Sequence, residues 1–157
     1  MKPSVMCCLA VLFLISASSC ATKKSALRNC STLNIIYVNN VPSEQGVGRE
    51  GIFSIINTGK VPVSLPLDWG SSHHIHSQYA TPEERVSSND SWQIFNLALE
   101  EVMGWRTHMT IRPEHTKKIA YYANGLFNGG PLPGDTEYSI VVTDLSGCTY
   151  RSVPFKP

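Results

Sequence analysis

Short apolar stretches alternate with turn-forming clusters along most of this chain. Runs rich in Val, Ile, Thr, Tyr and Phe recur from Leu33 onwards, and groups of Gly, Pro, Asn and Asp separate them. This pattern is typical of domains built from antiparallel strands, so we predict an all-β fold, an antiparallel β-sandwich. The predicted strands are 33–38, 51–56, 61–67, 72–79, 92–97, 107–111, 117–123, 137–143 and 148–154.

Two of these segments carry conflicting signals. Apolar residues alternate over 61–67, but Pro62 and Pro66 each remove a ladder donor, which places this strand at a sheet edge or at a switch between sheets. Residues 91–103 could instead form an amphipathic helix. We favour a strand at 92–97, where aromatic and β-branched residues gather.

The N-terminal segment has the layout of a secretory signal. Lys2 is followed by an apolar run from Val5 to Ile15, and small residues occupy 16–19. The apolar run is about half of the roughly 20 residues that a membrane-spanning helix needs. We therefore divide the chain into a signal peptide (1–19), a lipidated cysteine and polar tether (20–31), and a β-sandwich domain (32–157).

The cysteine count favours a lipid anchor at Cys20. The chain has five cysteines, and Cys7 and Cys8 leave with the signal peptide. If Cys20 were an ordinary residue, three cysteines would remain, an odd number in an oxidising compartment. Lipid on Cys20 removes the odd one and leaves Cys30 and Cys148 as a natural disulfide pair; two unpaired thiols are the alternative.

The stretch Ala17-Ser18-Ser19-Cys20 resembles the lipobox of bacterial lipoproteins, in which small residues precede a cysteine that is acylated and becomes the new N-terminus. That family usually has Leu where this chain has Ala17. The resemblance implies acyl chains such as palmitate on Cys20, which make membrane attachment stable. Ala21 stands where the family's inner-membrane retention signal has Asp, so the resemblance favours the outer membrane of a bacterial cell envelope. We expect the domain to face the periplasm, and the cell exterior is the alternative.

A second resemblance lies in the C-terminal third. The segment Leu132–Tyr138 and the alternating Ile140–Val142 resemble the beginning of a strand in fibronectin type III and immunoglobulin-like domains. The resemblance implies an immunoglobulin-like sandwich in which Tyr138 is a tyrosine-corner residue, its hydroxyl bonded to the chain upstream. It implies no ligand.

Charge and motifs argue against nucleic-acid and nucleotide binding. Loss of Lys2 turns the 13 Lys and Arg into 12, against 12 Asp and Glu, so no basic surface is expected. The stretch 46–51 matches the letters GxGxxG, but the β-rich 52–56 follows it instead of a helix. We predict a hairpin loop there and no cofactor.

The best chemical hypothesis is a metal site. His73, His74 and His76 form the one imidazole cluster, and on a strand His74 and His76 would point to one face and present two ligands to a transition metal. Such a site needs further ligands, and the possible contributors are Asp68, His108 and His115. The simpler interpretation, which we favour, is an exposed polar segment whose histidines bind no metal.

Catalytic chemistry is not predicted. The chain has no Gly-x-Ser-x-Gly elbow. The adjacent carboxylates at 83–84 and at 100–101 would point to opposite faces of a strand, so neither pair can work as an acid and a base together. We therefore expect solvated surface at both places and no enzyme.

Several aromatic residues could form a stacking face for a glycan or a protein, although core packing of most of them is the simpler interpretation. These are Trp69, Trp92, Trp105, Tyr121, Tyr122 and Phe127.

The expected function is that of a membrane-anchored envelope lipoprotein acting as a binding or structural module. One alternative is a metal-binding periplasmic protein that uses the cluster of His73, His74 and His76. Another is an inhibitor of an envelope hydrolase that inserts the loop 124–134 into its partner.

Overall fold

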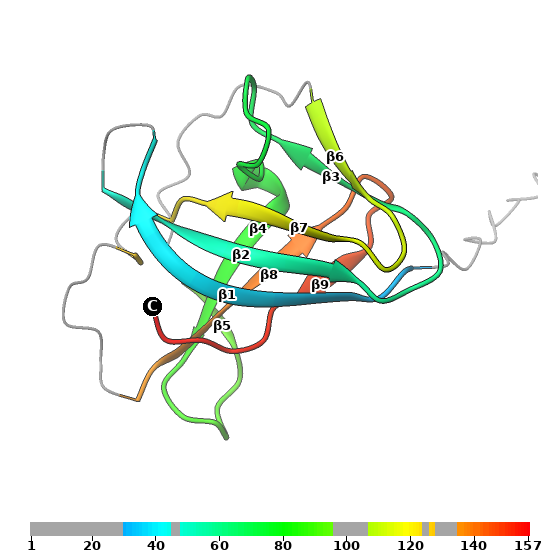
Figure 1. Ribbon diagram of the computed structural model, residues 1–157. Helices are drawn as coiled ribbons and strands as arrows, with labels where there is room; N and C mark the ends of the chain where they lie inside the picture. The colour runs from blue at the N-terminus through cyan, green and yellow to red at the C-terminus, as the bar shows by residue number, and fades with distance from the viewer. Residues whose placement is uncertain (1–29, 45–47, 96–106, 124–125, 128–134) are drawn as a thin grey trace, which may run out of the picture.

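The fold is all-β, as the sequence predicts. The computed structural model describes residues 30–44, 48–95, 107–123, 126–127 and 135–157, and no α-helix occurs among them (Figure 1). No helix in this part of the chain is long and apolar enough to cross a bilayer. The elements are β1 (Leu33–Pro42), β2 (Arg49–Asn57), β3 (Val63–Leu67), the 3-10 helix η1 (Ser77–Tyr79), β4 (Ala80–Arg85), β5 (Gln93–Ile94), β6 (Thr107–Ile111), β7 (Thr116–Tyr121), β8 (Glu137–Thr143) and β9 (Thr149–Arg151).

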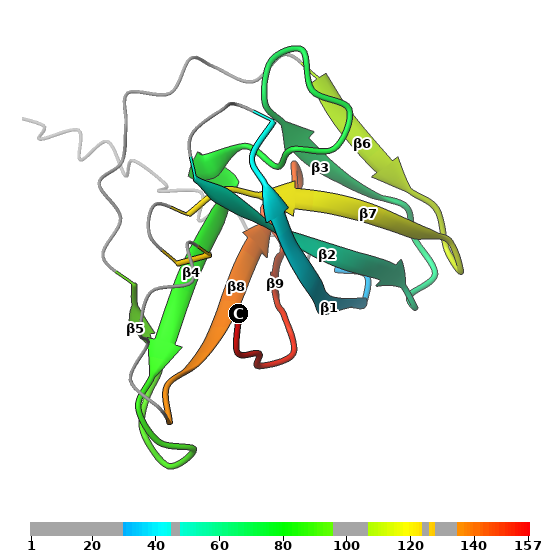
Figure 2. The same cartoon turned by 60° about the vertical axis from the view of Figure 1, so that its left-hand side comes forward.

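Within the described residues, all ladders are antiparallel, and they form three sheets. One has the order β1-β2-β7, the second β5-β4-β8-β9, and the third contains β3 and β6. The first two sheets lie across one another with their strand directions crossed, as Figures 1 and 2 show. This arrangement is consistent with the predicted β-sandwich.

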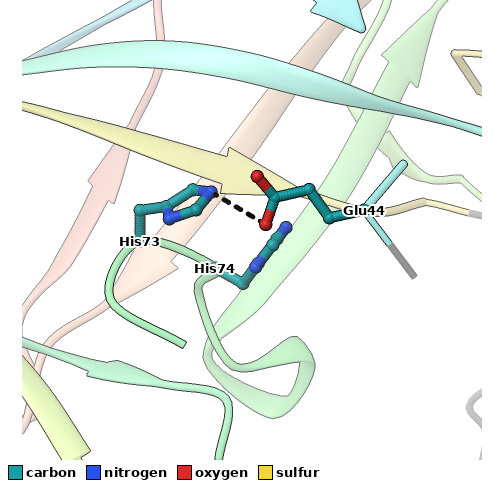
Figure 3. A group of neighbouring side chains, drawn as sticks. All are labelled: Glu44, His73 and His74. Atoms are coloured by element: carbon teal, nitrogen blue, oxygen red, sulfur yellow. Dashed lines mark ion pairs between the residues drawn. The ribbon is translucent and has the colours of Figure 1, made fainter. Parts of the chain in front are cut away.

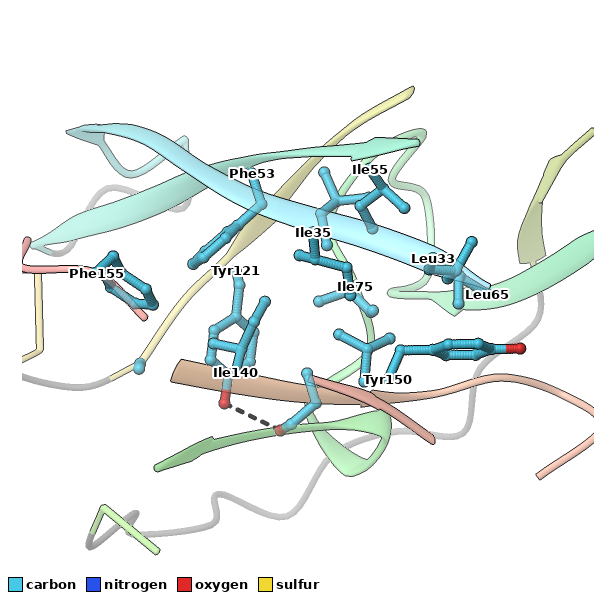
Figure 4. Packing of buried hydrophobic residues seen from close by; sticks show 14 of the residues in the cluster. Leu33, Ile35, Phe53, Ile55, Leu65, Ile75, Tyr121, Ile140, Tyr150 and Phe155 are labelled. Atoms are coloured by element: carbon cyan, nitrogen blue, oxygen red, sulfur yellow. Dashed lines mark hydrogen bonds between the residues drawn. The ribbon is translucent and has the colours of Figure 1, made fainter. Parts of the chain in front are cut away.

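The core lies between these two sheets. Figure 4 shows side chains of β1 and β2, among them Ile35 and Phe53, facing Ile140 of β8. Phe155 closes the cluster at one end, where its ring stacks on Tyr37 at 4.6 Å between centroids. Each large apolar side chain buried in this way contributes about 1.5–3 kcal/mol to stability.

The predicted disulfide is present. Cys30 and Cys148 are bonded, with their Cα atoms 5.8 Å apart and 118 positions apart in sequence. Cys30 precedes β1 and Cys148 precedes β9, so the bond fastens the beginning of the domain to its last strand.

Strand β4 is an element that the sequence analysis missed. Its sequence, ATPEER, combines a proline with three charged residues, which is unfavourable composition for a strand. It is nevertheless an inner strand, between β5 and β8. Pro82 lies opposite Ile140 of β8. The backbone N–H of Ile140 donates to Ser152 Oγ, and its carbonyl accepts from the Ser152 N–H, so neither group of Ile140 bonds to β4. The proline therefore removes no hydrogen bond from the β4–β8 ladder.

The charged residues of β4 are paired across the sheet. The Glu83 carboxylate accepts from Arg151 at 2.7 Å and from the Ser139 hydroxyl at 3.3 Å, and Arg85 bonds to Glu137 at 2.7 Å. The prediction of solvated surface is therefore wrong for Glu83, whose side chain is only 15% exposed. Residues 100–101 lie outside the described residues.

Two other predictions need correction. The segment 72–79 is not a continuous strand, because it consists of two bridge residues followed by η1. The predicted strand 92–97 is reduced to Gln93–Ile94, and 96–106, with most of the alternative helix, lies outside the described residues. The tyrosine-corner bond of Tyr138 stays a prediction, because residues 128–134 upstream lie outside the described residues; the Tyr138 ring is buried and packs edge-on against Phe95.

Candidate metal centre

The histidine segment joins two of the sheets. The backbone of Ile75 and that of His73 bond to Ala120 of β7, while His76 N–H donates to the Pro66 carbonyl of β3. Ile75 points into the core, so His74 and His76 point to the opposite face. The segment therefore acts as a short connecting strand, and its position is set by β3 and β7 together.

The turn before this segment is held by Ser71. Its Oγ accepts hydrogen bonds from the backbone N–H groups of His73, at 3.1 Å, and His74, at 2.7 Å. Gly70 before it has φ of 77°, a left-handed conformation that glycine adopts without strain. The turn thus presents His73 and His74 side by side, with ring centroids 4.4 Å apart.

His74 forms a buried pair with Glu50 of β2. Its Nε2 lies 2.8 Å from Glu50 Oε2, and its Nδ1 lies 2.9 Å from Ser71 Oγ. The imidazole of His74 is thus held from both sides, by the Glu50 carboxylate at Nε2 and by the Ser71 hydroxyl at Nδ1.

His73 and Glu44 complete a cluster at the surface above this pair. Glu44 follows β1, and its carboxylate lies 3.9 Å from Nε2 of His73 (Figure 3). One potential ligand atom each from Glu44, His73 and His74 lies within 4.8 Å of the other two. Figure 3 shows both imidazole rings turned toward the carboxylate. Two imidazoles and a carboxylate are the donor types that Zn²⁺ and related transition metals prefer.

His76 is not part of this cluster. Its Nδ1 accepts the backbone N–H of Gln78 at 3.3 Å and caps η1, while its ring packs against Tyr79. The expectation that His74 and His76 act together is therefore not met by the geometry, and the expectation of an exposed segment is wrong, because both side chains are buried. The histidine whose ligand atom lies close to that of His74 is therefore His73.

The other residues considered as ligands do not join the group. Burial raises the pKa of Asp68, an effect that His76 and His74 oppose electrostatically, but its carboxylate is not within the set of mutually close ligand atoms. His108 and His115 lie exposed on β6 and in the β6–β7 turn.

The hydrogen-bonded chain of Ser71, His74 and Glu50 resembles the order of groups in a serine-hydrolase triad. A nucleophilic oxygen needs a free lone pair aimed at the substrate carbonyl carbon. Ser71 Oγ has both lone pairs engaged by backbone N–H groups. The chain therefore positions the imidazole and stabilises the turn.

The aromatic residues do not form one stacking face. Tyr121 and Phe127 are buried in the core, and the Tyr121 hydroxyl donates to the Ala80 carbonyl, a bond drawn in Figure 4. Trp69 is exposed, and Trp92 has the guanidinium of Arg85 over its ring at 4.5 Å. Trp105 and most of 124–134 lie outside the described residues, so the inhibitor-loop hypothesis stays a prediction.

The sequence analysis missed both carboxylates of the site. Glu44 lies in the β1–β2 connection, and Glu50 belongs to β2, where it occupies the face opposite Phe53. No short-range pattern relates them to histidines 24 to 29 positions later, because only strand pairing brings the segments together.

No protein-family model matches this sequence, and no match was found among curated proteins.

Proposed function

We propose that this protein is exported, cleaved before Cys20 and held by lipid on that cysteine in the outer membrane of a bacterial envelope. There its domain, a sandwich of the immunoglobulin-like kind, faces the periplasm and acts as a binding or structural module. The observation that carries the proposal is the disulfide between Cys30 and Cys148.

Two arguments connect the disulfide to a lipid anchor. Stable structural disulfides form in oxidising compartments, which supports export. The bond also uses two of the three cysteines that follow the signal peptide, so it leaves Cys20 for acylation. In addition, the bond lies where the tether meets the domain, so a pull on the anchor acts directly on both Cys30 and the β8–β9 connection.

The anchor is tested by expressing the full chain in a bacterial host with labelled palmitate. We expect label in the protein, loss of label in Cys20→Ser, and retained label in the control Cys8→Ser. Density fractionation and protease protection in intact cells then report the membrane and the face. A mature product in the soluble fraction with no added fatty mass would contradict the proposal.

A second function, transition-metal binding, is favoured by the convergence of Glu44, His73 and His74. We expect the mature protein, purified from the envelope fraction, to retain one equivalent of Zn²⁺ after gel filtration. The variant His73→Gln should lose the metal, and His108→Gln should keep it, because His108 is exposed on β6, outside the cluster. Metal content measured by mass spectrometry near zero in the unaltered protein excludes this function.

A further inference from the structure

We propose that the end of the domain from which the tether leaves is a second membrane contact, which binds the anionic headgroups of the lipids around the anchor. This surface, the anchor end, consists of the turns 58–62, 112–115 and 144–148 and the first residues of β7, 116–118. The inference rests on the lipid anchor proposed above and adds a non-covalent contact between the domain and the same membrane.

The three turns of the anchor end lie together at the point where the chain leaves for Cys20. The backbone N–H of Thr58 donates to the Thr32 carbonyl, so the β2–β3 turn packs on the beginning of β1. The N–H of Asn57 donates to the His115 carbonyl, which joins the β6–β7 turn to it. The disulfide adds the β8–β9 turn. Figures 1 and 2 both show the beginning of β1 and the first two of these turns at one end of the molecule.

Positive charge is concentrated at the anchor end. Four of the eight lysines and arginines among the described residues lie there, all of them exposed: Lys60, Arg112, Lys117 and Lys118. None of the four has an ion-pair partner in this part of the chain. Of the ten described aspartates and glutamates, only Glu114 and the buried Asp144 lie there, whereas the rest of the described domain has eight carboxylates and four cations. The overall charge balance, from which we expected no basic surface, therefore conceals one.

Exposed apolar side chains lie among these cations. Val61 is 41% exposed in the β2–β3 turn, and Leu145 is 37% exposed in the β8–β9 turn. The backbone N–H of Leu145 donates to the carbonyl of Ser64, at the beginning of β3, so the two turns are neighbours. Surfaces that bind to membranes combine these two features, because cations attract anionic headgroups and apolar side chains bury area at the acyl boundary.

The short tether keeps the anchor end close to the membrane. Ten residue steps lead from Cys20 to Cys30, and a fully extended chain of that length spans at most about 36 Å. The headgroups are therefore present at a high effective concentration, so a weak attraction is sufficient. Each Lys or Arg beside an anionic surface strengthens binding about fivefold, and the anchor end contributes four of them. The tether sequence adds Lys23, Lys24 and Arg28, which have the same sign.

Contact at this end gives the domain an orientation. Strand β1 begins at the anchor end and extends through ten residues, or about 33 Å, to the β1–β2 connection. Glu44 lies in that connection, so the cluster of Glu44, His73 and His74 is held on the side away from the membrane. The membrane contact thus leaves the candidate metal site open to the periplasm.

The test is lysine labelling of the mature protein, purified with its lipid from the envelope fraction and reconstituted in vesicles. One set of vesicles is pure phosphatidylcholine, and the other contains equal amounts of phosphatidylcholine and anionic phosphatidylglycerol. An acylating reagent is added outside, and mass spectrometry gives the rate at each lysine. We expect the three lysines of the anchor end to react several-fold more slowly on the anionic vesicles. High salt should remove this difference, because it screens the attraction.

The chain contains its own control. Lys156 is exposed and follows Phe155, which Figure 4 shows at the end of the core opposite Leu33, so it should react at the same rate on both kinds of vesicle. The variant Arg112→Gln removes one cation and keeps the three lysines as reporters, so their protection should fall by up to about fivefold. The matched variant Lys156→Gln should leave that protection unchanged.

The outcomes separate this inference from the anchor on which it rests. Equal rates at the lysines of the anchor end on the two kinds of vesicle overturn the headgroup contact, while the lipid anchor stands. Protection that Arg112→Gln and Lys156→Gln reduce equally overturns the assignment of the contact to this end. A mature protein without an acyl chain overturns the anchor and, with it, the short tether that the inference requires.

Discussion

Removing the disulfide should cost this domain a large part of its stability. In the double variant Cys30→Ala, Cys148→Ala the unfolded chain regains the freedom that the cross-link withholds. The bond closes a loop of 118 residues. The chain-entropy relation gives about 16 cal/mol/K for this length, or about 4.9 kcal/mol at 25 °C. Since small domains unfold with a total of about 5–15 kcal/mol, the loss is a third of the stability or more.

Urea unfolding of the mature protein, oxidised and as the double variant, measures this difference. We expect the midpoint to fall and the slope to rise, because the uncross-linked unfolded state exposes more surface. Reduction of the unaltered protein serves as the control and should produce the same loss. A difference below about 1 kcal/mol would refute the loop-closure reasoning, and alkylation of Cys30 and Cys148 in the unreduced protein would refute the bond itself.

Two further predictions concern single buried sites. Burial alone would raise the pKa of Asp144, but hydrogen bonds from the Ser146 and Tyr150 hydroxyls and from two backbone N–H groups outweigh it and lower the pKa below its usual 3.8. Asp144 therefore stabilises the fold above about pH 4 and loses this effect as the pH falls through the lowered pKa. Asp144→Asn should cost about 1–3 kcal/mol at pH 7 and progressively less in acid, as urea unfolding from pH 7 to pH 2 would show; a cost independent of pH would contradict this. Gly51→Ala should cost about 1–3 kcal/mol, because the added Cβ would clash with the Phe127 ring. Thermal unfolding should show a smaller cost in a Phe127→Leu background, and an equal cost there would place the strain elsewhere.

The strands were predictable where their own residues alternate. β1, β2, β6 and β8 all overlap predicted segments, because one face of each is buried and the side-chain period is visible in the sequence. β4 was not predictable, since its charges become compatible with a strand only when Arg151 and Glu137 lie beside them on β9 and β8. Residue-by-residue propensity contains no information about such partners.

The site was predictable only in part. The histidine cluster drew attention by composition, but the sequence favoured His74 with His76, assuming an extended strand throughout. The chain turns into η1 after His76, so that side chain caps the helix and His73 becomes the relevant neighbour. Glu50 gave no signal, because a single acidic residue on the outer face of a strand is normally solvated.

By itself, the sequence determined the all-β class, the β1–β2 hairpin and the pairing of Cys30 with Cys148, all of which depend on short-range periodicity, turn chemistry or a count of thiols. The tertiary structure alone decided that Glu50 and His74 are buried together and that Glu44 and His73 lie above them. These four residues come from segments that touch only because β7 pairs with β2 on one edge and with the histidine segment on the other. Long-range pairing of this kind depends on how whole sheets bury their apolar faces, and no local pattern encodes it.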